Sequence, residues 1–247
     1  MRLAISALSK PGGREPNEDA FGWWSSPTGC FCLLCDGAGG HGGGEVASKL
    51  AVRVALSYFQ AEPIGTGACI HGAIAAAHEA IVNAQASNRA LAQMRATVVV
   101  LAIDTANGIA TWGHLGDSRL YCFRNGGIIA RTTDHSVVQR MIDAGYLAGR
   151  DIRSLPDRNQ LFAALGQAEN FAPAVVDSPL ALRTGDAFLV CTDGFWAMVQ
   201  DRTMLDTLRD APTTEAWLDA MEREVLANGG RDQDNYSALA IWCDDGS

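Results

Sequence analysis

The order of the predicted strands and helices constrains the fold of this chain more than any other feature of its sequence. Nine short runs rich in Val, Ile, Phe, Trp and Tyr predict β-strands. These runs are residues 3–9, 20–25, 30–35, 97–104, 109–115, 119–124, 128–132, 187–191 and 236–243. Because strands occur in runs on both sides of a helix pair, without regular alternation, the order favours an α+β fold with helices outside antiparallel sheets.

Two long helices are predicted between the third and fourth strands, at residues 45–60 and 69–87. Their apolar residues recur at helical spacing, as Val46, Leu50, Val54 and Tyr58 in the first and Ile70, Ile74, Ala77, Ile81 and Ala84 in the second. Further helices are predicted at 135–144 and 214–228, and Asn125-Gly126-Gly127 predicts a hairpin. No linker or repeat divides the chain, so residues 1–247 are expected to form one domain.

Composition and charge limit the partners that this chain can have. It has 28 acids and 19 bases, a net charge of −9, which argues against nucleic acid or an anionic membrane. No apolar run approaches the roughly 20 residues of a membrane span, and the first residues show no secretory signal. Seven cysteines, an odd number mostly in apolar runs, are typical of a reducing compartment. We therefore expect a cytoplasmic protein.

Acidic residues lie at the ends of the predicted strands. They are Asp36, Asp117 and Asp193 after apolar runs, and Glu18, Asp19 and Asp234 before them. Buried carboxylates are costly unless a cation balances them, and Arg14 and Arg119 are the obvious local cations. An oxygen-only set without Cys-His spacing suits Mg²⁺ or Mn²⁺ better than Zn²⁺. The sequence therefore predicts a divalent-metal site.

Other interpretations of these residues remain open at this stage. Any single Asp can be a turn or cap residue, and Asp117 can instead pair with Arg119. The loop after Asp36 also contains G-x-G-x-x-G, a dinucleotide pattern. However, Asp36 would repel a pyrophosphate, and no acid ends a second strand about 20 residues further on. The glycines favour a backbone that wraps closely around an ion, with the Gly37 carbonyl as a ligand.

Eight short motifs occur in order along nearly the whole chain. They are REPNED at 14–19, DGAGGHGGGEVAS at 36–48, ATVVV at 96–100, GHLGDSRLY at 113–121, TTDHSVV at 132–138, ALG at 164–166, CTDG at 191–194 and DNYS at 234–237. With these motifs in this order, the chain resembles the metal-dependent protein Ser/Thr phosphatases of type 2C, in their compact bacterial form. That family's fold, a β-sandwich flanked by helix pairs in α/β/β/α layers, agrees with the fold class predicted from the strand order.

The resemblance implies metal ligands at five matching positions. Asp36 would bridge two ions, and Gly37 would give its carbonyl oxygen to one of them. Asp193 and Asp234 would complete the other metal site. Asp117, together with Asp193, would hold a weaker third ion. The ions would be Mn²⁺ or Mg²⁺.

The resemblance also implies the residues around these ligands. Glu18 would act mainly through metal-bound water, and Asp19 and Asn235 would support the ligand shell. Arg14 matches the family's phosphate-binding arginine. Residues 145–162 match its flap, which agrees with the polar composition and missing apolar period of that segment.

The residue that would protonate the leaving group is less defined. Eukaryotic family members carry His directly after D-G as the proposed acid, whereas this chain has Ala38 there. His41, in the glycine-rich loop, could be this acid or could only orient the loop, and metal-bound water is the other candidate.

The function implied by the resemblance is hydrolysis of phosphoserine and phosphothreonine in proteins by a hydroxide held between two metal ions. The partners would be phosphorylated proteins, the substrates of a Ser/Thr kinase, and we expect a monomer. The alternative is a pseudophosphatase, which binds phosphoproteins without turnover.

Overall fold

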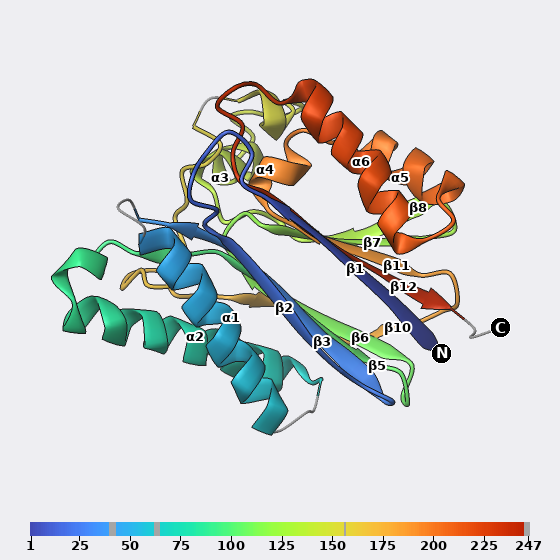
Figure 1. Ribbon diagram of the computed structural model, residues 1–247, viewed down its shortest axis with the longest axis horizontal. Coiled ribbons are helices and arrows are strands. Elements are labelled where there is room, and N and C mark those ends of the chain that lie inside the picture. The colour runs from blue at the N-terminus through green and yellow to red at the C-terminus, as the bar shows by residue number, and fades with distance from the viewer. Residues whose placement is uncertain (40–42, 62–64, 156, 245–247) are drawn as a thin grey trace.

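Two antiparallel sheets face each other in the computed structural model, which describes residues 1–39, 43–61, 65–155 and 157–244 (Figure 1). The first sheet has the order β1 (Arg2–Lys10), β12 (Tyr236–Asp244), β11 (Ala187–Cys191), β7 (Arg119–Arg124) and β8 (Gly127–Arg131). The second has the order β10 (Leu180–Ala181), β6 (Ile109–Leu115), β5 (Val98–Asp104), β3 (Gly29–Ala38) and β2 (Asp19–Ser26). Two further strands, β4 (Arg95–Ala96) and β9 (Ala174–Val175), pair with β3 and β6.

Helices cover both outer faces of this sandwich (Figure 1). α1 (Gly43–Ala61) and α2 (Gly67–Ser87) pack on the second sheet, while α5 (Asp201–Asp210) and α6 (Thr214–Asn228) pack on the first. The connections contain α3 (Val137–Asp143), α4 (Asp193–Trp196) and single 3-10 turns at Arg89–Leu91 and Ile152–Ser154. The predicted α/β/β/α layers are therefore confirmed. Among the described helices, none combines the length and apolarity that a membrane crossing needs.

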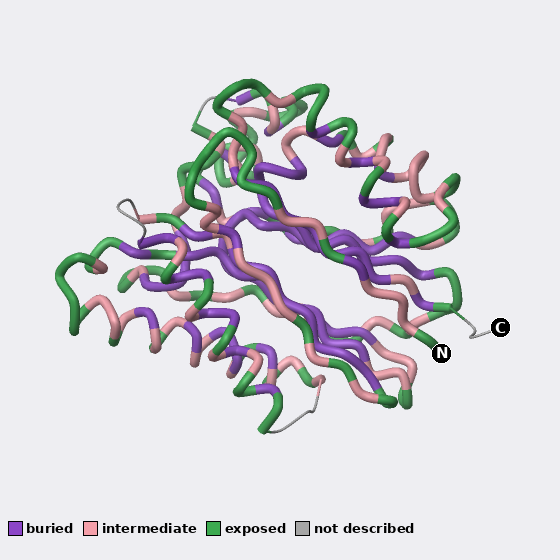
Figure 2. The backbone as a smooth tube through the Cα atoms, viewed as in Figure 1, coloured by how far each residue is buried: buried purple, intermediate pink, exposed green. Residues whose placement is uncertain are grey.

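Three apolar cores hold the layers together, one between the sheets and one under each helix pair. Alternate residues of β3 pack into two of these cores. Cys32 and Leu34 face the other sheet, while Leu33 and Cys35 face the helices. Cys32 and Cys35 therefore point to opposite faces of the sheet and cannot bind one ion together. Figure 2 shows the inner strands as almost continuously buried.

The positions of α1, α2, α3 and α6 were predicted well, but the buried face of α1 was not. Val46 and Tyr58, on the apolar spacing found in the sequence, are each 41% exposed. The face that packs on the sheet carries smaller residues, which are Ala47, Ser48, Ala51 and Ala55, with Val52 and Phe59. The missing side chain at Gly22 lets this helix approach β2 closely, because a Cβ there would lie only 2.8 Å from Leu56 Cδ1 and 3.0 Å from Val52 Cγ1. Close packing against the sheet, and not the size of the apolar side chains, therefore decides which face of α1 is buried.

The ends of several strands meet at one end of the sandwich, away from the chain termini (Figure 1). β3, β6 and β11 finish there, and β2 and β12 begin there. The acidic residues that border these strands in the sequence are therefore brought together, although they are far apart along the chain.

Candidate active site

A cavity of about 270 Å³ opens at this end of the sandwich. Its lining includes eight of the residues singled out from the sequence: Arg14, Glu18, Asp36, Gly37, Asp117, Asp193, Asp234 and Asn235. Asp19 is buried beside it, opposite Asp36 in the pairing of β2 with β3. His41 lies outside the residues that the structure describes.

The backbone at Gly37 is too crowded for any other residue type. A Cβ there would lie 2.1 Å from the carbonyl oxygen of Gly44 and 2.7 Å from that of Glu18. The Gly37 N–H also donates to the Glu18 carbonyl at 3.1 Å. The Asp-Gly step at the end of β3 therefore locks the β3 end, the β2 start and the first turn of α1 together.

Neutral side chains fix the backbone next to the acids. Thr97 Oγ1 accepts from the N–H of Asp36 at 3.0 Å and lies 2.7 Å from Ser118 Oγ. Asn235 Oδ1 accepts from the N–H of Glu18 at 2.8 Å, and its Nδ2 donates to the carbonyl of Pro11. Asn235 thus joins three separate segments of the site.

Burial, and after it mutual repulsion, raises the pKa of the carboxylates around the cavity. Burial raises the pKa of Asp36, Asp117 and Asp193, and the neighbouring aspartates raise each of them further. Burial likewise raises the pKa of Asp19 to about 7. Asp19 Oδ1 is buried without a hydrogen-bond partner among the described residues.

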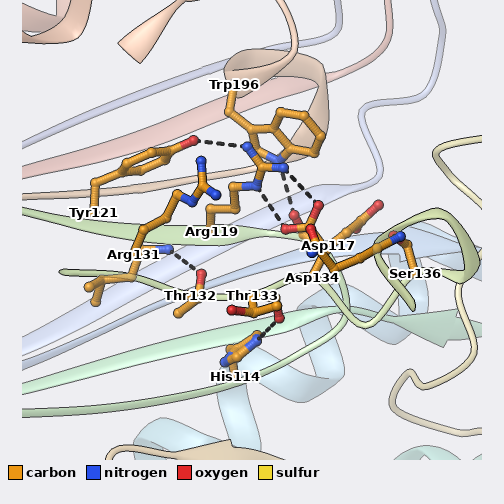
Figure 3. A network of polar contacts seen from close by, with 12 residues as sticks. His114, Asp117, Arg119, Tyr121, Arg131, Thr132, Thr133, Asp134, Ser136 and Trp196 are labelled. Carbon is orange, nitrogen blue, oxygen red and sulfur yellow. Dashed lines mark hydrogen bonds and ion pairs between the residues drawn. The ribbon is translucent and has the colours of Figure 1, made fainter. Parts of the chain in front are cut away.

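The arginines near the cavity balance only part of this charge. Arg14 forms an ion pair with Asp234, and the charge of Arg158 lowers the pKa of Asp193. The suggested pairing of Asp117 with Arg119 is not observed. Arg119 instead forms two 2.7 Å hydrogen bonds to the carboxylate of Asp134 (Figure 3). The negative charge of the cluster thus remains largely uncompensated by the chain.

The Asp117 loop is held in place by groups on either side of it. Trp196 Nε1 donates to the Asp117 carbonyl at 2.9 Å, and the N–H of Gly116 donates to His135 Nδ1 at 3.3 Å. Burial lowers the pKa of His135 to about 4, so the ring is neutral and can accept at Nδ1. Ser136 caps α3, since its side chain accepts from the N–H of Gln139.

The donor set fits a hard divalent cation. Across the lining that the structure describes, the side-chain oxygens available to an ion are those of carboxylates, amides and the Thr97 hydroxyl, without sulfur or imidazole. No three His, Cys, Asp or Glu side chains in the described ranges are already arranged as a ligand set. The carboxylate of Asp234 is paired with Arg14, so an ion and the guanidinium would compete for it.

Several lining residues were not found from the sequence. Arg95 lies on β4, directly opposite Ala38 of β3, one residue before the ATVVV motif. Asn159 and Leu161 come from the segment predicted as a flap, and their only signal was that segment's position between motifs. Short, irregular segments carry no periodic pattern that would place them.

The segment 145–162 is anchored at its middle and lines the cavity at its end. Ile152 and Leu155 are buried in the core under α5 and α6. The Arg153 guanidinium donates to the carbonyls of Trp196 and Val199 and to the carboxylate of Asp201. A segment fixed in this way can shape the entrance to the site.

The comparisons with known proteins agree with the fold. Residues 11–233 match the model of the protein phosphatase 2C family. The chain is 32% identical over 203 residues to the serine/threonine protein phosphatase PstP of Mycobacterium tuberculosis, covering 81% of this chain but only 38% of PstP. It is 28% identical over 236 residues to the serine/threonine phosphatase stp of Listeria monocytogenes, covering 92% of this chain and 90% of stp.

Solved structures give the same result. A crystal structure of the PstP catalytic domain in complex with two manganese ions superposes with a TM-score of 0.83 at 28% identity, covering 98% of this chain and 99% of that one. The Staphylococcus aureus phosphatase Stp1 gives a TM-score of 0.88 at 25% identity, with coverage of 99% and 96%. This chain belongs to the protein phosphatase 2C family.

Proposed function

We propose that this chain hydrolyses phosphoserine and phosphothreonine in proteins, with Mn²⁺ or Mg²⁺ as cofactor. The observation that supports this function best is the convergence of Asp36, Asp117, Asp193 and Asp234, from four separate segments, on one cavity that Arg14 also lines. Family membership supports the reaction class.

The acidic residues would hold the ions. In this proposal Asp36, the Gly37 carbonyl, Asp193 and Asp234 hold two ions, and Asp117 with Asp193 holds a weaker third. Bound divalent ions would supply positive charge for the phosphoryl oxygens and lower the pKa of an attacking water. The burial that raises the pKa of Asp36 and Asp193 favours any cation that replaces their protons.

Neighbouring residues would position these ligands. Asn235 holds the backbone of Glu18, so that this carboxylate stays at the cavity wall. Thr192 Oγ1 donates to Asp19 Oδ2 at 3.1 Å, whereas the buried Oδ1 has no hydrogen bond to a described residue. Glu18 and Asp19 would thus orient water and ligands near the ions.

Arg14 would bind the phosphoryl group of the substrate. Its side chain is 57% exposed and reaches Asp234 at the cavity mouth. A cation on Asp234 would compete for that carboxylate and free the guanidinium, which offers two parallel donors to phosphoryl oxygens. The leaving alkoxide would take its proton from His41 or from water.

The cellular setting completes the proposal. Residues 1–247 would act as one catalytic domain, as a monomer in the cytoplasm, on proteins phosphorylated by a Ser/Thr kinase. Neither nucleic acid nor a membrane is proposed as a partner, in keeping with the net charge of −9.

The test is metal-dependent turnover. We expect the purified chain to release phosphate from a phosphoserine peptide and from p-nitrophenyl phosphate with Mn²⁺, and to stop in excess EDTA. Peptide binding without turnover in Mn²⁺ or Mg²⁺ would instead support the pseudophosphatase, which is disfavoured because Asp36, Asp193 and Asp234 all line the cavity.

A further inference from the structure

A second cavity, of about 300 Å³, adjoins the carboxylate cavity. The two cavities share Arg14, Asn159 and Asp234, so a molecule bound in one can extend into the other. Arg158 and Arg231 line only the second cavity. Arg158 comes from the segment 145–162, and Arg231 comes from the connection between α6 and β12.

These two arginines lack the direct ion pairs that several other arginines of the chain form, although the charge of Arg158 also acts on Asp193 in the neighbouring cavity. Arg124, Arg153 and Arg202, for example, each form an ion pair with an aspartate. Neither Arg158 nor Arg231 forms an ion pair or side-chain hydrogen bond within the part of the chain that the structure describes. The cavity thus carries positive charge that is free to bind an anion.

Arg158 also has an unsatisfied donor. Its Nε is buried without a hydrogen-bond partner among the described residues, although the residue as a whole is half-buried. A buried N–H that lacks a partner carries a desolvation cost, so an oxyanion that accepts from it gains more than at a solvated site.

The acids in this cavity do not cancel the charge of the two arginines. Asp234 is already paired with Arg14. Asp232 is exposed and adjacent to Arg231, and it forms no ion pair that the described residues show. The balance at the cavity therefore favours an anionic ligand over a cationic one.

We propose that this cavity, the arginine subsite, binds a second anionic group of the same phosphopeptide, close in sequence to the phosphorylated residue. This inference rests on the proposed function. The group is a carboxylate or a second phosphoryl group, since both present the oxygen pair that a guanidinium binds through two parallel hydrogen bonds. Phosphoproteins with an acidic or doubly phosphorylated sequence around the target residue are the preferred substrates.

The test compares peptides that share one phosphoserine. One peptide has neutral flanks, a series carries Asp at each flanking position in turn, and another series carries a second phosphoserine there. In Mn²⁺ we expect acidic groups at one or two adjacent positions to lower KM about tenfold, with kcat little changed, as charge-assisted hydrogen bonds at a partly solvated site allow. The preference should weaken as salt is raised.

Variants of the two arginines test whether these residues cause the preference for acidic peptides. Arg158→Gln and Arg231→Gln should each reduce the ratio of KM values between neutral and acidic peptides, and the double variant should bring it close to one. Using this ratio within each variant removes general effects on turnover. Arg202→Gln, on the exposed face of α5, is the matched control and should keep the wild-type ratio.

The outcomes separate this inference from the proposed function. Turnover of the neutral peptide with an equal KM for every acidic peptide overturns the arginine subsite and leaves the phosphatase activity standing. A preference that survives the double variant overturns it too. If no peptide is hydrolysed, fluorescence anisotropy of labelled peptides still measures the preference as a ratio of Kd values, and equal Kd values overturn the subsite. A preference for carboxylate, for phosphoryl or for both identifies the natural group.

Discussion

Two clusters of buried charge lie next to each other in this molecule, and the chain balances only one of them. In the first, the side chains of Arg119 and Asp134 are 1% and 2% exposed, and their two 2.7 Å hydrogen bonds run in parallel. Tyr121 Oη accepts a third hydrogen bond from Arg119, and Trp196 packs its ring 3.4 Å from the guanidinium carbon (Figure 3). In the second, the aspartates of the carboxylate cavity mainly face one another.

The difference shows what each cluster is for. A charge that its own chain satisfies completely contributes to the fold, and it specifies how β7 and the loop after β8 come together. Charges of one sign that the chain leaves unsatisfied make the metal-free fold less stable. In the proposed function, bound Mn²⁺ or Mg²⁺ would supply the missing charge. Changes in the first cluster should therefore affect folding, and changes in the second should affect metal binding and turnover.

The largest effect is expected where the balanced cluster is broken. Arg119→Met leaves the Asp134 carboxylate buried and unpaired, which should lower the free energy of unfolding by about 3–5 kcal/mol. Urea unfolding in EDTA measures this loss without a contribution from metal. The double variant Arg119→Met/Asp134→Leu, in which neither charge remains, should recover most of the stability. A loss below about 1 kcal/mol in the single variant would contradict a structural role for the pair.

The next largest effect is expected from the unbalanced cluster, and it has two opposite parts. Asp36→Asn should lower Mn²⁺-dependent turnover at least about 100-fold, or about 2.7 kcal/mol in activation free energy. The same change should stabilise the metal-free protein at pH 8, because it removes a charge whose pKa burial raises. The exposed Asp219→Asn is the control and should change neither quantity. Wild-type turnover in Asp36→Asn would exclude Asp36 as a metal ligand.

A smaller effect is expected at Asp117, where the two clusters meet. Asp117→Ala should lower turnover about tenfold and remove one Mn²⁺ from the stoichiometry measured by calorimetry. Folding should be little affected, because Trp196 bonds the main-chain carbonyl of this residue and not its side chain. Identical stoichiometry and turnover at every Mn²⁺ concentration would make Asp117 a structural residue.

The sequence predicted the strands that form the sandwich, because apolar alternation and β-branched residues directly reflect burial between layers. It did not predict β9 and β10, which have two residues each, nor α5, in which Met204 is the one buried residue. Such elements are held by neighbours and carry little pattern of their own. Similarly, the alanine face of α1 is hidden by larger apolar residues beside it.

The site residues were likewise predicted only where the sequence carries a pattern. The order of the motifs indicated the four aspartates of the cavity, and the structure places them together. The partner of Arg119 was not predictable from local sequence, because Asp134 lies beyond the β7–β8 hairpin, whereas Asp117 is two residues away. Arg158 was missed because its importance depends on a cavity formed by distant segments.

The smallest expected effect is a pH dependence of stability, which distinguishes the carboxylate cluster from the Arg119–Asp134 pair. The pKa of Asp19 is about 7 in the folded chain against 3.8 for a free carboxyl, so between these values the folded state binds more protons than the unfolded state. The free energy of unfolding of the metal-free protein should therefore decrease as pH rises through this window, by about 1 kcal/mol between pH 6 and 7. Melting temperatures in EDTA should fall by about 2–4 °C over that unit.

Mn²⁺ should reverse this trend, because the ion replaces the protons on the cluster and binds more tightly as they leave. The gain in melting temperature on adding Mn²⁺ should therefore be larger at pH 7 than at pH 6. Asp19→Asn should flatten the pH dependence in EDTA, whereas Asp134→Asn should lower stability at both pH values, since that carboxylate is balanced by Arg119 throughout. An EDTA melting temperature that rises from pH 6 to 7 would show that the carboxylate cluster is not the unbalanced charge of the fold.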